Sequence, residues 1–127
     1  MKFAEYFSKM KNLKKSVNFK SGNKIKGSIL IVFPDEDIER EKRKNFISLI
    51  LLFFNMDATE IFENENKVFF SEVEYFEKDS KIFMEIAEKI SGTRAFGEEF
   101  SGTKILASYL EKEGKEYKSL WLDFQIR

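Results

Sequence analysis

The sequence of 127 residues contains no histidine and no cysteine. Histidine is the side chain whose ordinary pKa lies nearest to neutral pH, and cysteine supplies the thiol nucleophile and the thiolate ligands of zinc. Their absence excludes imidazole and thiol catalysis, disulfide bonds and the usual zinc sites. Carboxylate and lysine chemistry remain open, as do functions that depend on binding alone, and we expect no cofactor.

Proline is also scarce, with a single residue at Pro34, whereas phenylalanine is abundant, with 15 residues. Apolar residues make up 43% of the chain, which is too many for a disordered protein, and charged residues make up 35%, which is too many for a membrane protein. A chain of this length buries roughly two-thirds of its unfolded surface, so it needs no metal or disulfide for stability. We therefore expect one α+β domain over residues 1–127.

Long apolar segments are missing as well, because the longest run, Phe46–Phe54, is interrupted at Ser48. A helix of that length extends about 14 Å, which is about half of the hydrocarbon core of a bilayer. The first residues lack the continuous apolar stretch of a secretory signal peptide. We expect a cytoplasmic protein without a transmembrane segment.

Charge is unevenly distributed along the chain, although the net charge is zero. Residues 1–28 carry eight lysines and one acidic residue, and the remainder carries 14 basic and 21 acidic residues. This asymmetry is explained either by two functional faces of opposite charge or by ion pairing within the folded domain.

In the first half of the chain, apolar spacing predicts a helix over 3–15, a hairpin of strands 17–20 and 24–33, and a helix over 36–55. Asp35 is the expected N-cap of the second helix. Its last part, 46–54, is equally compatible with a core strand; three leucines and the absence of a helix breaker favour the helix.

In the second half, the expected elements are a helical turn at 57–63, a strand at 68–76, a helix at 80–90 ending at Gly92, a helix at 103–112 and a strand at 117–126. The order of helices and full strands is then α-β-β-α-β-α-α-β. Such a chain fits an α+β fold with a four-stranded, largely antiparallel sheet and helices on one face.

Two of these strands carry the candidate binding residues. Strict alternation places Glu72 and Glu74 on one face with Phe70 and Phe76, and on the last strand it directs Trp121 and Asp123 away from the core. Aromatic side chains are enriched at protein interfaces, and acidic groups attract basic partners. We therefore hypothesise a protein-binding function, such as an inhibitor, immunity protein or antitoxin that binds a basic nuclease or toxin.

The basic first quarter of the chain supports a second hypothesis. Five lysines around the expected hairpin could contact the phosphates of a nucleic acid, and these are Lys14, Lys15, Lys20, Lys24 and Lys26. The same 28 residues contain no arginine, the side chain most used to recognise bases.

A third hypothesis rests on a short motif. Pro34-Asp35 at the end of an apolar strand, followed later by Glu65-Asn66-Lys67, resembles the pattern of the restriction-nuclease-like PD-(D/E)xK superfamily. That resemblance implies a magnesium-dependent nuclease in which Asp35 and Glu65 hold the metal and Lys67 helps to orient the attacking water. Against it, a long expected helix separates the two parts, and Glu65 lies in an expected loop.

Overall fold

A computed structural model describes residues 24–76, 80–92 and 96–127 of the chain. In chain order the elements are β1 (Lys24–Val32), α2 (Arg40–Phe53), β2 (Met56–Asn64), β3 (Lys67–Phe76), α3 (Ser80–Ser91), the 3-10 turn η1 (Glu98–Phe100), β4 (Lys104–Glu113) and β5 (Glu116–Gln125). The expected helix at 3–15 and the expected strand at 17–20 lie outside the described residues.

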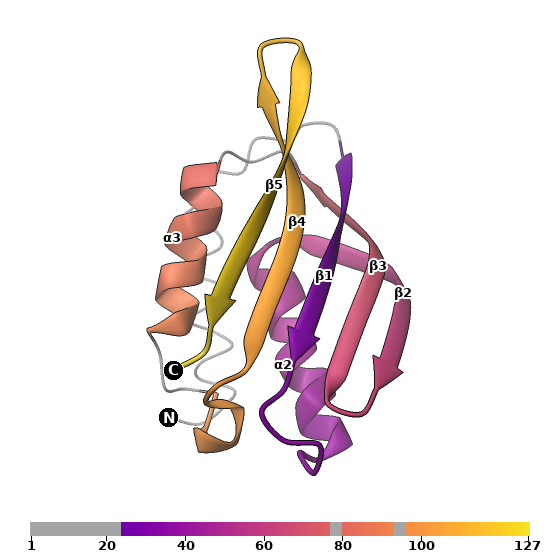
Figure 1. The fold of residues 1–127 in the computed structure, drawn as a ribbon, viewed down its shortest axis with the longest axis vertical. Coiled ribbons are helices and arrows are strands. Elements are labelled where there is room, and N and C mark those ends of the chain that lie inside the picture. The colour runs from indigo at the N-terminus through magenta and orange to yellow at the C-terminus, as the bar shows by residue number, and fades with distance from the viewer. Residues whose placement is uncertain (1–23, 77–79, 93–95) are drawn as a thin grey trace.

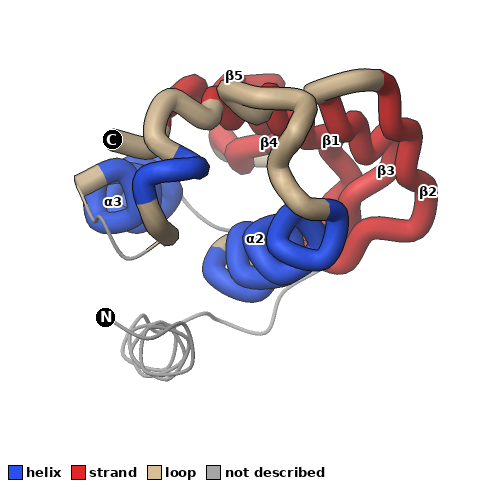
Figure 2. Tube along the Cα trace, turned by 90° about the horizontal axis from the view of Figure 1, so that it is seen from below, coloured by secondary structure: helices blue, strands red, loops and turns tan. Residues whose placement is uncertain are grey.

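The five strands form one antiparallel sheet in the order β2-β3-β1-β4-β5 (Figure 1). Both α2 and α3 lie on the same face of this sheet (Figure 2). The predicted class is confirmed: the fold is α+β, with an antiparallel sheet and helices on one face. The described sheet has five strands rather than four: two segments predicted to be helical are the strands β2 and β4, and the predicted strand 17–20 lies outside the described residues.

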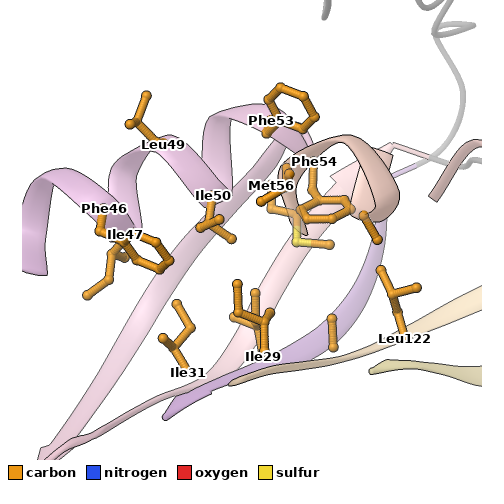
Figure 3. Close-up of a cluster of buried hydrophobic side chains, with 14 of the residues drawn as sticks. Ile29, Ile31, Phe46, Ile47, Leu49, Ile50, Phe53, Phe54, Met56 and Leu122 are labelled. Atoms are coloured by element: carbon orange, nitrogen blue, oxygen red, sulfur yellow. The ribbon is translucent and has the colours of Figure 1, made fainter. Parts of the chain in front are cut away.

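The core lies between the sheet and the two helices. From α2, Phe46, Ile47 and Ile50 point toward Ile29 and Ile31 of the central strand β1 (Figure 3). All five side chains are buried. Since alternate residues of β1 face the helices, its apolar sequence supplies one wall of the core.

Phenylalanine rings join the parts of the core that are distant in sequence. Phe46 of α2 stacks on Phe100 with ring centroids 4.7 Å apart, and Phe83 of α3 stacks on Tyr109 of β4 at 4.3 Å. Phe83 also lies 5.8 Å from Phe54, which links the end of α2 to α3. Each such ring pair contributes about 0.5–1.5 kcal/mol to stability beyond the contribution of the apolar area that it buries.

Two segments predicted to be helical are strands. Residues 57–63 lie in β2, and 103–112 lie almost entirely in β4. In β4 the buried residues Ile105, Ala107 and Tyr109 alternate with less buried ones, which is the period of a strand. Pairing with neighbouring strands outweighed the local capping signals, because each strand satisfies its backbone groups across the sheet.

The predicted helix over 36–55 is confirmed for residues 40–53, including most of the ambiguous apolar run. It begins later than expected because the Asp35 carboxylate accepts a hydrogen bond from the N–H of Asp37 at 2.9 Å and closes a local turn. Asp35 is therefore not the N-cap of α2, and Glu39 occupies that position. No helix in the ranges 24–76, 80–92 and 96–127 is long and apolar enough to cross a membrane.

The central strand meets β4 at a close contact. Strand β1 pairs with β4 only from Ser28 to Val32, and there the Ser28 N–H donates to Oγ of Ser108 at 3.0 Å. A Cβ atom on Gly27 would clash with the carbonyl oxygen of Ser108 and approach the Tyr75 ring to 2.9 Å. The Tyr75 hydroxyl accepts a hydrogen bond from the N–H of Leu110. Glycine at 27 is therefore required by the approach of two strands and a ring.

Replacing Gly27 by alanine should destabilise the fold, because the new methyl group forces β1 away from β4. The expected loss is about 1–3 kcal/mol in the free energy of unfolding, as for other overpacked sites. Urea denaturation followed by circular dichroism measures it. Ser119→Ala, an exposed change on β5, is the matched control and should be neutral. Equal midpoints for Gly27→Ala and the wild type would contradict this account.

Stability should also depend on the Tyr75 phenol at high pH. Burial raises the pKa of Tyr75 from 10.0 to about 12, against the opposing effect of the Leu110 hydrogen bond. The unfolded chain then loses this proton at lower pH than the folded chain, so stability present below pH 10 is lost as the pH rises toward 12. Tyr75→Phe removes this dependence.

We expect Tyr75→Phe to be about 1 kcal/mol less stable than the wild type at pH 8, because the Leu110 N–H loses its acceptor. Near pH 11 this difference should vanish. That pH is one unit above the pKa of the unfolded phenol, so ionisation of unfolded Tyr75 has by then lowered the stability of the wild type by about 1.4 kcal/mol. Urea titrations at a series of pH values test this. A constant difference across that range would show that the Tyr75 phenol is not linked to folding.

Candidate functional site

The face of the sheet opposite α2 and α3 carries a continuous row of side chains, and we call this face the open face. In register, the row runs Phe62 (β2), Phe69 (β3), Leu30 (β1), Leu106 (β4) and Asp123 (β5). Phe62 is 58% exposed and Phe69 is 39% exposed, whereas Leu30 and Leu106 are half-buried. Within the described ranges, no helix covers this row.

The rows on either side of it are polar and differ in charge. One neighbouring row holds two exposed lysines, Lys67 and Lys104, on either side of Val32. The opposite row joins acidic, hydroxyl and aromatic side chains, which are Glu60, Glu72, Ser28, Ser108 and Trp121. The open face is thus an apolar stripe with a basic border on one side and an acidic border over β2 and β3.

Like charges oppose each other directly where β2 pairs with β3. Asp57 is in register with Glu74, and Glu60 is in register with Glu72. The Oε2 atom of Glu60 accepts a hydrogen bond from the Ser71 hydroxyl at 2.8 Å, and Glu74 also faces Lys26 in the β1–β3 register. Acidic residues directly opposite each other on paired strands are destabilising. The Glu60–Glu72 pair therefore raises the free energy of the isolated domain.

An irregular pairing in β3 determines which aromatic side chains reach the open face. From Phe70 to Val73 the strand takes three steps, whereas β1 takes two from Ile29 to Gly27. The additional residue places both Ser71 and Glu72 on the open side and leaves Phe70 and Val73 facing the core.

The prediction that Phe70 lies on the binding face is therefore wrong. It is 4% exposed and lies among the core side chains, because strict alternation counted back from Glu74 ignores the bulge. Phe69 and its partner Phe62 are exposed instead, and neither is a binding residue predicted from the sequence. The sequence feature that indicates an exposed ring here is the pair Phe69-Phe70 itself, because adjacent residues of a strand point to opposite faces.

The other predicted binding residues fall into two groups. Glu72 and Glu74 are on β3, and Trp121, 61% exposed, and Asp123 are on β5. Strands β1 and β4 lie between the groups, a separation of about 14 Å from the usual strand spacing. They share the open face without forming one cluster.

The remaining described candidates lie near one end of β1 and β3. Phe76 ends β3 opposite Lys24 of β1, and Lys26 lies two residues further along β1. Lys14, Lys15 and Lys20, the other candidates for nucleic-acid binding, lie outside the described residues.

The structure brings the two parts of the proposed nuclease motif to one end of the sheet, where Arg43 of α2 joins them. Its guanidinium donates hydrogen bonds to the carbonyl oxygens of Glu65 at 2.9 Å, of Asp35 at 3.2 Å and of Glu36. It also lies 5.2 Å from the centre of the Phe33 ring.

These residues do not fit a magnesium site. The Asp35 carboxylate is used in a turn with Asp37, and Glu65 lies in the β2–β3 turn with a φ of 53°. Across the part of the chain that the structure describes, no group of three or more acidic side chains could hold a metal ion. A cationic guanidinium among these groups would also repel a divalent cation. Their arrangement ties α2 to the adjoining loops.

Replacing Arg43 by lysine should weaken this tie, because an ammonium cannot reproduce the planar fork that reaches three carbonyl groups. We expect the free energy of unfolding to fall by about 1–3 kcal/mol. Arg40→Lys, an exposed change on the same helix, is the control and should be neutral. Urea midpoints decide the matter, and equal values for both variants would mean that the guanidinium geometry is unimportant.

Comparison with known proteins gives no further guide to this surface. The chain matches no family model, no curated protein and no solved structure.

Proposed function

We propose that the protein binds another protein through the acidic and aromatic part of its open face on β2 and β3. The partner carries a basic surface. An inhibitor, immunity protein or antitoxin acting on a basic nuclease or toxin is the most specific form of this proposal.

The observation that carries the proposal is the placement of acidic residues in register across β2 and β3, next to two exposed phenylalanines. Glu60 and Glu72 oppose each other in register, and like charges so placed raise the free energy of the isolated domain by an amount that cationic groups of a partner can offset. Phe62 and Phe69 adjoin these acids and supply apolar area for the contact. Acidic groups then steer association, and the aromatic rings contribute most of the affinity.

A second exposed aromatic extends the surface across the sheet. Trp121 is 61% exposed on β5 and lies in register with Ser108 of β4. Tryptophan is among the residues most enriched at binding hot spots. A partner large enough to span the open face would contact both the β2–β3 acids and Trp121.

Affinity capture from the source cell tests this function. The wild-type protein should retain a stoichiometric protein partner at low salt, and binding should weaken as salt is raised, because the steering charges become screened. The double variant Glu60→Lys/Glu72→Lys and the single variant Phe69→Ser should each bind on the order of 10- to 100-fold more weakly, as for one or two hot-spot contacts.

Met84→Ser is the matched control, because Met84 is 51% exposed on α3, and α3 lies on the face of the sheet opposite the open face (Figure 2). It should leave binding unchanged. Absence of any stoichiometric partner at low salt, or equal capture by all of these variants, would refute the proposed function.

A further inference from the structure

Strand β2 is the edge of the sheet on one side (Figure 1). It pairs with β3, and within the described residues no strand pairs with its other side. The unpaired N–H and C=O groups of an edge strand are a template for an added strand. The part from Ile61 to Asn64 is in regular register with β3, so its backbone is extended and uninterrupted.

Two large apolar side chains follow each other on this edge and point to opposite faces. Ile61 lies in register with the core residue Phe70, and Phe62 lies in register with Phe69 of the open face. Ile61 is 52% exposed and Phe62 is 58% exposed. A partner resting on the open face would cover only Phe62. A strand added alongside β2 would contact both, because its side chains alternate between the same two faces.

The charge of β2 indicates which charge an added strand would carry. Its nine residues include three acids, Asp57, Glu60 and Glu63, and no lysine or arginine. The edge also lacks proline and lysine, two common means of blocking strand addition. A second copy of β2 would bring acids against acids, whereas a basic segment would bring opposite charges together.

We infer that the partner presents an extended basic segment that adds as a strand to the free edge of β2. Apolar residues of that segment cover Ile61 and Phe62, and lysine or arginine residues lie near Glu60 and Glu63. This inference rests on the proposed function and specifies how the partner is held: backbone hydrogen bonds supply affinity, and the alternating side chains supply selectivity.

Selection from a display library of random 12-residue peptides against the full chain tests the inference without the natural partner. We expect enrichment of basic peptides with alternating apolar residues and no central proline. The best peptide, made synthetically, should protect the β2 amides from hydrogen exchange. Methylating alternate backbone nitrogens along the edge that pairs with β2 should weaken it at least 10-fold, since its charge is unchanged but its pairing is blocked.

Protein variants locate the site. Ile61→Lys and Phe62→Lys should each weaken peptide binding at least 10-fold, and Met84→Lys, on α3, should not. Urea denaturation and circular dichroism establish that each variant is folded before binding is measured.

Several outcomes would overturn the inference. These are failure to select any peptide, selected peptides that are not basic, or binding that is insensitive to nitrogen methylation. Binding that is lost in Phe62→Lys but kept in Ile61→Lys would place the ligand on the open face alone, so strand addition would fail while the proposed function stood. Failure to capture a cellular partner, with peptide binding intact, would instead count against the proposed function.

Discussion

The fold depends on the pairing of β1 with a strand on each side. The β2–β3 hairpin and the β4–β5 hairpin do not touch each other in the sheet; each is joined to it through β1. On the β4 side this pairing covers only Ser28–Val32, and Gly27 and Tyr75 occupy the point where the two strands separate. A small residue and a buried phenol thus determine how closely the two halves approach.

This arrangement also explains why the open face of the sheet is free of helices in the described residues. Alternate residues of all five strands form a single apolar face, and α2 and α3 bury it through rings such as Phe46 and Phe83. The opposite side chains are then presented to a partner as one surface, even though they come from segments far apart in sequence. The acids of β2 and β3 and the tryptophan of β5 owe their common face to β1 and β4.

Most elements could be predicted from sequence because their periodicity is unambiguous. The strand at 68–76 and the helix at 80–90 alternate or repeat with one clear period, and the final strand directs Trp121 and Asp123 outward as expected. The prediction of a helix at 103–112 was wrong because the apolar spacing of these residues suits both a helix and a strand. Long-range pairing with β1 and β5 decided between them, and local propensity carries no information about that pairing.

The candidate surface also depends partly on composition and partly on tertiary structure. Composition alone determined what chemistry is absent, since no fold can supply a missing imidazole or thiol, and the acidic sequence of 57–74 determined the sign of the surface charge. Tertiary structure decided which aromatic rings accompany those acids. The bulge between Phe70 and Val73 turns Phe70 into the core and leaves Phe69 outside, because one additional residue reverses the alternation of a strand. Only the completed sheet made β2 an edge, since the position of a strand is a property of its neighbours.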